Sequence, residues 1–304
     1  MRTRACAAVL SVAVVGCARA DGPAEDRRVP ILSSVGHRLS SRAVGSDFQV
    51  SVVLPRSYAT DTSRRFPVVY LLDGNELTGV AASLAWELRF TGAPEVILVG
   101  IDYPVPSLDG SQGTRFRDLT PSTDSGAVAA MASEYRALGL PEPTASGGAS
   151  AFLSLLTDDL IPFVDSVYRT QPTERTLLGF SLGGLFAMHV LLERPEHFRN
   201  YIALSPSLWW DGGELLTRVA RLNLATDAPR RLFVSIGLLE ENPTYRMVTD
   251  VRALEQALRT YAPSALEWHV QYFPDENHSS GWPGAMSRGL RYVFGVWSPP
   301  PRAE

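Results

Sequence analysis

Short runs of almost purely apolar residues constrain the fold of this chain most strongly. Residues 68–72 and 96–99 are such runs. Strands that are apolar on both faces are typical of a parallel sheet covered by helices on each side. Within 248–258, apolar residues recur at helical spacing, which predicts a helix that packs on the sheet through one face. Together these patterns predict a mostly parallel, doubly wound α/β fold.

The same reading predicts an alternation of strands and helices along the chain. We expect strands at 48–54, 67–72, 96–101, 176–180, 201–204, 231–237 and 267–273. We expect helices at 80–90, 152–168, 182–193, 214–222, 245–261 and 284–296. Residues 104–150 are rich in Gly, Ser, Pro and Thr and too long for an ordinary connection, which predicts a lid-like insertion.

Composition narrows the possible functions. A chain of 304 residues with 45% hydrophobic residues suits one folded domain, placed here at 31–297 with a loose tail at 298–304. A net charge of -4 without a basic cluster argues against a nucleic-acid partner, and no obligate protein partner is evident. Because both cysteines lie in the first twenty residues and no histidines have zinc spacing, we expect no disulfide, metal or cofactor.

The first twenty residues have the pattern of an export signal. Arg2 and Arg4 precede an apolar run, 5–15, that is too short to span a bilayer. The Val-Val-Gly-Cys sequence that follows resembles a lipobox and predicts a lipoprotein anchored through Cys17, with 21–30 as a tether. Cleavage after Ala20, giving a plain secreted enzyme, is the alternative. In either case we expect an exported, periplasmic or cell-envelope protein.

The strongest chemical signal is the sequence Gly-Phe-Ser-Leu-Gly-Gly at 179–184. It is a G-x-S-x-G motif placed between an expected strand and an apolar helix, the context of a nucleophile elbow. Glycines are needed there because the turn is too tight for side chains on both sides. The motif predicts Ser181 as a nucleophile and the backbone N–H of Leu182 as an oxyanion donor.

A serine hydroxyl needs a neighbouring base, which in this fold comes from the loop after the last strand. His278 lies in that loop among polar residues. The other histidines fit less well: they are His37, His189, His197 and His269. We therefore predict His278 as the general base.

The acid that orients the base should follow the strand at 231–237. Glu240 is the first carboxylate past that strand and is our choice. Glu241 and Asp211 remain alternatives, as does a Ser-His pair without an acid, whereas Asp250 lies too far along the next helix.

A second oxyanion donor is expected in the loop after residues 68–72. We choose the backbone N–H of Asn75, because Gly74 beside it permits a close approach. The alternative is a simple turn that ends a strand.

Five segments together resemble one known family. In order they are YLLDG at 70–74, RDLTP at 117–121, GFSLGG at 179–184, SPSLWW at 205–210 and ENH at 276–278. The chain from 45 to 294 thus resembles the esterase D and siderophore-esterase family of α/β-hydrolases. The resemblance implies an α/β-hydrolase fold, hydrolysis of carboxylic esters such as the serine-ester backbone of enterobactin, and no cofactor. It also implies Ser181 and His278 as catalytic residues, whereas Glu240 is a weaker match because some relatives work as a Ser-His pair.

Three further residues are candidates for substrate contact. Arg117 could fix an anionic or carbonyl-rich substrate, and Trp209 with Trp210 could line an aromatic wall beside the serine. The alternatives are that Arg117 fixes a loop and that the Trp pair packs under one.

We predict hydrolysis of a small-molecule ester, such as a siderophore, through an acyl-enzyme. An acyltransferase that uses the same serine is one alternative. A siderophore-binding protein of the cell envelope without turnover is another, disfavoured because binding alone would not need Ser181, His278 and a nearby carboxylate.

Overall fold

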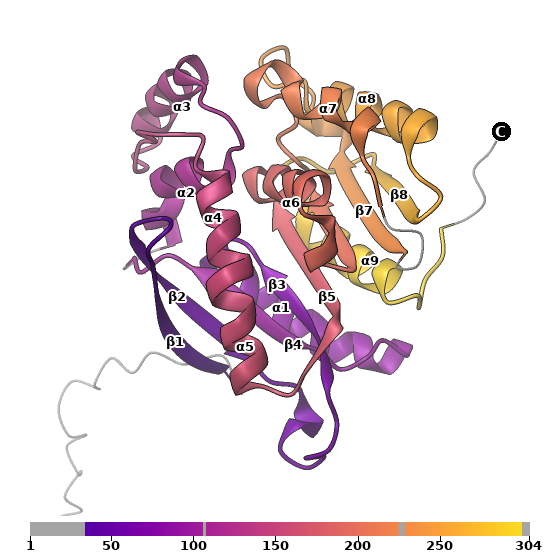
Figure 1. Cartoon of the computed structure of the whole chain (residues 1–304). Helices are drawn as coiled ribbons and strands as arrows, with labels where there is room; N and C mark the ends of the chain where they lie inside the picture. The colour runs from indigo at the N-terminus through magenta and orange to yellow at the C-terminus, as the bar shows by residue number, and fades with distance from the viewer. Residues whose placement is uncertain (1–33, 106–107, 225–228, 300–304) are drawn as a thin grey trace, which may run out of the picture. The chain divides into compact units, whose positions relative to one another are not determined.

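The computed structural model describes residues 34–105, 108–224 and 229–299, which form one eight-stranded sheet with helices on both faces (Figure 1). The strands are β1 (Ser34–Ser41), β2 (Ser46–Val53), β3 (Phe66–Leu71), β4 (Ile97–Asp102), β5 (Thr170–Phe180), β6 (Asn200–Leu204), β7 (Arg230–Gly237) and β8 (Leu266–Phe273). Their order in the sheet is β1-β2-β4-β3-β5-β6-β7-β8.

Among the eight strands described, β2 runs against the other seven. β1 pairs with β2 antiparallel, and β2 pairs with β4 antiparallel, whereas all later pairs are parallel. This order and direction are those of an α/β-hydrolase sheet, so the predicted fold class is confirmed. Because β3 to β8 are parallel, their carboxyl ends share one edge, where a site is expected.

The helices divide between the two faces of the sheet. They are α1 (Gly74–Leu88), α2 (Gln112–Leu119), α3 (Ser125–Ala137), α4 (Ala149–Ser154), α5 (Ile161–Val167), α6 (Leu182–Glu193), α7 (Glu214–Arg218), α8 (Met247–Tyr261) and α9 (Trp282–Val293). Apolar residues of α1 and α9 share one core cluster on one face, while those of α2, α4, α5, α6, α7 and α8 share the other. Figure 1 shows α4, α5 and α6 in front of the strands.

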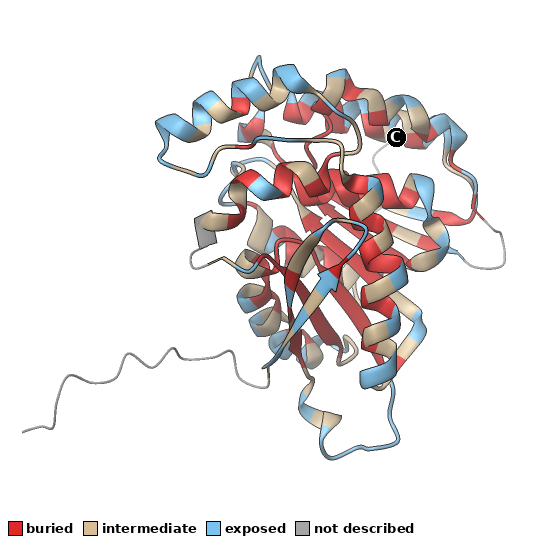
Figure 2. Cartoon of the chain, turned by 60° about the vertical axis from the view of Figure 1, so that its left-hand side comes forward, coloured by how far each residue is buried: buried red, intermediate tan, exposed pale blue. Residues whose placement is uncertain are grey.

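Burial explains why the central strands could be found from sequence. Every residue of β3, β4 and β6 is buried, and Figure 2 shows these strands almost entirely red. Strands with both faces covered have to be apolar throughout. β1 was missed because its residues are largely polar and mostly exposed or half-buried, which is the pattern of an edge strand.

One expected boundary needs correction. α1 begins at Gly74, soon after β3, instead of at residue 80. The 104–150 segment, which we expected to be a lid-like insertion, contains α2 and α3. Phe116 and Leu119 of α2 are buried in the main core. α2 is therefore part of the folded domain.

The predicted export signal, Cys17 and the tether at 21–30 lie outside the described residues, as does most of the predicted tail. Among the helices that are described, none combines the length and the apolar character needed to cross a membrane.

Candidate active site

The nucleophile elbow joins β5 directly to α6. Ser181 stands between them with φ 59° and ψ -117°, a left-handed conformation that is strained for a residue other than glycine. A Cβ atom on Gly179 would lie 2.2 Å from the carbonyl oxygen of Gly183. The glycine at 179 is therefore required by the backbone of the turn itself.

The starts of two helices meet beside this serine. Leu182 is the first residue of α6 and Asn75 is the second of α1, so neither backbone N–H has an acceptor within its own helix. A Cβ on Gly183 would contact the side chains of Asp73, at 3.1 Å, and Leu72, which places the two helix starts against one another. Both predicted oxyanion donors thus lie at helix N-termini, where the dipole favours negative charge.

His278 and Glu240 form a hydrogen-bonded pair at the carboxyl ends of β7 and β8. His278 Nδ1 lies 2.6 Å from Glu240 Oε2. The glutamate side chain is 1% exposed, whereas the imidazole is 41% exposed. The pair forms because β7 and β8 are neighbours and end in register at Gly237 and Phe273, so that the loops after them lie together.

The hydroxyl of Ser181 lies 3.3 Å from the hydroxyl of Ser207, which follows β6. The backbone N–H of Ser207 also donates to the carbonyl of Ser181, at 3.1 Å. Phe180 packs against the imidazole of His278, with ring centroids 4.6 Å apart. The elbow, the loop after β6 and the histidine loop thus converge on one place.

The comparisons with known proteins identify the family. A family model described as Esterase, putative esterase, matches residues 41–113 and 123–291. This chain belongs to the putative esterase family. It is therefore a carboxylic ester hydrolase.

Individual relatives of this esterase span most of its length. It is 30% identical over 236 residues to the ferri-bacillibactin esterase BesA of Bacillus subtilis (strain 168), covering 75% of this chain and 79% of that protein. It is 28% identical over 282 residues to the siderophore triacetylfusarinine C esterase of Aspergillus fumigatus, covering 83% and 90%. The crystal structure of the BES protein from Bacillus cereus matches with a TM-score of 0.75 and 26% identity, over 90% and 99% of the two chains.

The other carboxylates considered for this esterase have different partners. Glu241 accepts backbone N–H groups from Val248 and Thr249 and so stabilises the start of α8. Asp250, within α8, pairs with Arg246 at 2.5 Å. Asp211 lies in a turn after β6 with φ 49°. Glu240 alone of these four bonds to the histidine.

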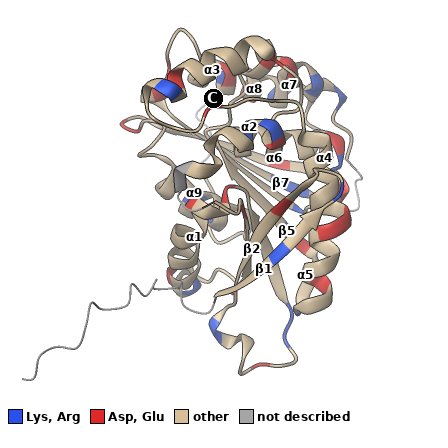
Figure 3. Cartoon of the chain, turned by 90° about the vertical axis from the view of Figure 1, so that its left-hand side faces the viewer, with Lys and Arg blue, Asp and Glu red and all other residues tan. Residues whose placement is uncertain are grey.

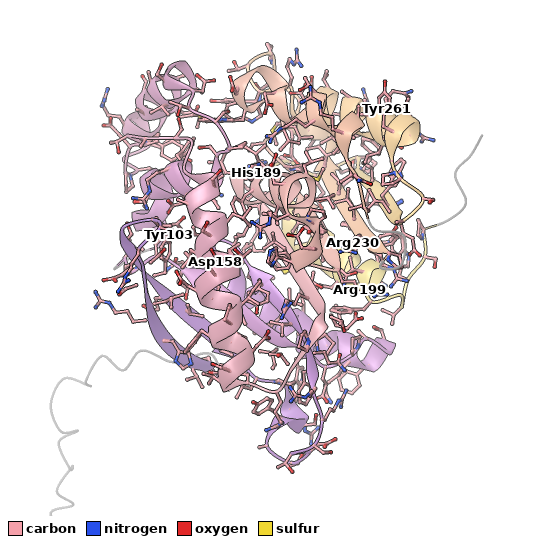
Figure 4. The ribbon with its side chains drawn as sticks, in the orientation of Figure 1. Tyr103, Asp158, His189, Arg199, Arg230 and Tyr261 are labelled. Carbon is pink, nitrogen blue, oxygen red and sulfur yellow. The ribbon has the colours of Figure 1, made fainter. Side chains whose placement is uncertain are left out.

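Two of the remaining histidines, His189 and His37, have surroundings that suit a structural role. His189 projects from α6 (Figure 4) and is 4% exposed. Burial lowers its pKa to about 4. His37 Nε2 lies 2.6 Å from the hydroxyl of Tyr168 in the edge-strand region. His37 thus bonds to Tyr168, away from the elbow, and the buried Nδ1 of His189 has no hydrogen-bond partner among the described residues.

Arg115 is a site residue that the sequence reading missed. Its guanidinium makes two bonds to Asp73, at 2.8 and 2.7 Å, and a third to the carbonyl of Phe180 at 3.3 Å. Asp73 precedes Asn75, the predicted oxyanion donor, and Phe180 precedes Ser181, the predicted nucleophile. Arg115 therefore links the two sides of the site from α2. Proximity to Asp73 raises its pKa against the opposing effect of burial.

Arg117 and Trp210 are held by other parts of the protein. Arg117 pairs with Asp118 at 2.6 Å and donates to the hydroxyl of Ser46, so it fixes a loop. Trp210 is 1% exposed, and its indole N–H donates to the carbonyl of Ser122, so it packs beneath the loop instead of facing a substrate. The aromatic wall that the sequence suggested is therefore reduced to Trp209, which is partly buried.

α3, in the second half of the 104–150 segment, lies near aromatic residues of the domain. Trp209 packs on Tyr245 with ring centroids 4.9 Å apart, and the Tyr245 hydroxyl donates to Glu134 of α3. Arg136 and Glu142 form an exposed ion pair at the end of this helix. Figure 3 shows basic and acidic positions together on α3. Met131 of α3 is buried in the main core and Val128 and Tyr135 pack against that core, so this helix is attached through both apolar and polar contacts.

Side chains suited to holding a metal ion are not clustered at this site. Within the described ranges, no group of three or more His, Cys, Asp or Glu residues could hold one.

Proposed function

We propose that this protein is a serine esterase with Ser181 as nucleophile, His278 as general base and Glu240 as the acid that orients it. The hydrogen bond between His278 and Glu240, beside a strained serine at the elbow, is the observation that supports this most. Because Nδ1 of the imidazole donates to the carboxylate, Nε2 is left free to accept the proton of the serine hydroxyl.

The reaction follows from this arrangement. The Ser181 hydroxyl turns from Ser207 toward His278, loses its proton to Nε2 and attacks the ester carbonyl. The N–H groups of Leu182 and Asn75 stabilise the oxyanion, and the imidazolium protonates the leaving alcohol. Water then attacks the acyl-enzyme in the same way, with His278 again as the base. The chemistry needs no metal or organic cofactor.

The proposed substrate is a siderophore-type ester, because two relatives that match most of the chain are named for siderophore hydrolysis. The test compares hydrolysis of ferric and iron-free enterobactin with hydrolysis of short and medium p-nitrophenyl esters, in wild type and Ser181→Ala. We expect faster turnover of the siderophore, lost in the variant. Turnover of simple esters alone would preserve the mechanism and reject this substrate.

We also propose, from the sequence pattern at 1–20, that the protein is exported and anchored to a membrane through a lipid on Cys17. Cell fractionation of wild type, Cys17→Ala and the matched Cys6→Ala control tests this. Membrane association that survives Cys17→Ala would exclude the anchor.

A further inference from the structure

Ser205 has a backbone conformation that is uncommon for a residue other than glycine. It directly follows β6, is 4% exposed and has φ 40°, in the left-handed region that favours glycine. Its N–H donates to the carbonyl of Ser235 on β7 at 2.9 Å, which holds it in place. Residues that the surrounding structure holds in a strained backbone conformation are found most often at functional sites.

The Ser205 side chain completes the hydrogen bonding of Glu240. Oε1 of the carboxylate accepts the Ser205 hydroxyl and the Gly237 N–H, each at 2.7 Å. Oε2 is then the oxygen that faces His278. Since the glutamate is buried, these three donors together fix which oxygen meets the imidazole.

The two donors to Oε1 differ in where they come from. Gly237 is the last residue of β7 and lies three residues before Glu240, so its N–H comes from the same stretch of chain as the acid. Ser205 belongs to the segment after β6, in which Ser207 contacts the backbone and hydroxyl of Ser181. The Ser205 hydroxyl therefore ties the acid to the part of the chain that also holds the nucleophile.

We propose that Ser205 is a positioning residue for catalysis, acting through Glu240; this rests on the proposed role of Glu240 as the acid. Its hydroxyl stabilises the ionised carboxylate and keeps Oε2 directed at His278. Without it the carboxylate can rotate, and the imidazole loses its fixed orientation. Because Ser205 is buried, its removal affects kcat and not substrate binding.

The test uses two variants that lose the hydroxyl in different ways. Ser205→Ala keeps the backbone strain, whereas Ser205→Gly relieves it. We expect kcat to fall about tenfold in both, with KM unchanged. The matched control is Ser235→Ala, which removes a hydroxyl that is equally buried but has no hydrogen-bond partner among the described residues. It should keep the wild-type kcat.

A double-mutant cycle separates positioning from a general structural role. In a Glu240→Ala background, Ser205→Ala should lower kcat no further. An equal loss in that background, or wild-type kcat in Ser205→Ala, would overturn the role of Ser205 and leave the proposed function intact. Wild-type activity in Glu240→Ala alone would overturn both the acid assignment and the role of Ser205.

Discussion

Two helices next to the site differ sharply in how the protein holds them. Ten of the twelve residues of α6, which carries the elbow, are buried. All thirteen residues of α3 are described, and Met131 is the one that is buried. Ser181, the proposed nucleophile, thus directly precedes a helix that is buried along most of its length, whereas α3 is attached through one buried side chain, partly buried apolar residues and a hydrogen bond from Tyr245. We therefore expect substitutions in the buried elements to affect the chemical step and substitutions in α3 to affect it little.

The largest effect should come from Gly179→Ala. Its Cβ would lie 2.2 Å from backbone at Gly183, so the elbow would have to deform. We expect ester hydrolysis to fall by about a hundredfold or more, because small displacements of the nucleophile are that costly. Steady-state kinetics measures this. The matched control is Gly126→Ala in α3, whose Cβ meets nothing closer than 3.4 Å and should leave activity unchanged.

Breaking the Arg115–Asp73 pair should destabilise the fold. Both side chains are 7% exposed or less, and loss of one partner from a buried pair costs about 3–5 kcal/mol. Urea unfolding of Arg115→Met should show this loss. Arg136→Met removes the exposed ion pair of α3 and should leave the unfolding midpoint unchanged. If Arg115→Met and Arg136→Met lowered the free energy of unfolding equally, the inferred difference between the buried site and α3 would be contradicted.

The buried carboxyl of Asp102 should make the free energy of unfolding depend on pH. Burial raises the pKa of this carboxyl, at the end of β4, to about 6, above its usual value of 3.8. Its stabilising contribution is therefore complete below about pH 4 and lost as the pH rises through 6. Asp102→Asn should match wild type at pH 4 and exceed it at pH 7 by about 2 kcal/mol. Unfolding free energies that stay equal at both pH values would contradict this assignment.

The smallest effect should come from Tyr245→Phe, which removes the hydroxyl bonded to Glu134 of α3. We expect KM for a bulky ester to change by no more than about threefold with kcat unchanged, as for a group that affects binding alone. A large fall in kcat would mean that α3 takes part in the chemistry.

Patterns within short stretches of the sequence predicted most of the fold and the candidate catalytic residues. The apolar strands were visible because burial on both faces requires them, and Ser181 was visible because the tight turn requires Gly179. The order of nucleophile, acid and base along the chain led to Glu240 and His278.

Residues whose importance depends on tertiary contacts could not be predicted in this way. Arg115 and Arg117 are two residues apart on α2, yet Arg115 reaches Asp73 and Phe180 while Arg117 pairs with its neighbour. Nothing in the local sequence distinguishes these two directions. The bond from Ser205 to Glu240 likewise joins residues 35 apart through the pairing of β6 and β7.

Mass spectrometry of the protein after reaction with a fluorophosphonate tests most directly whether Ser181 is the nucleophile. Two hydroxyls 3.3 Å apart compete for this reagent, those of Ser181 and Ser207. We expect a single adduct on Ser181, absent from Ser181→Ala and retained in Ser207→Ala. An adduct on Ser207, or no adduct on correctly folded wild type, would contradict it.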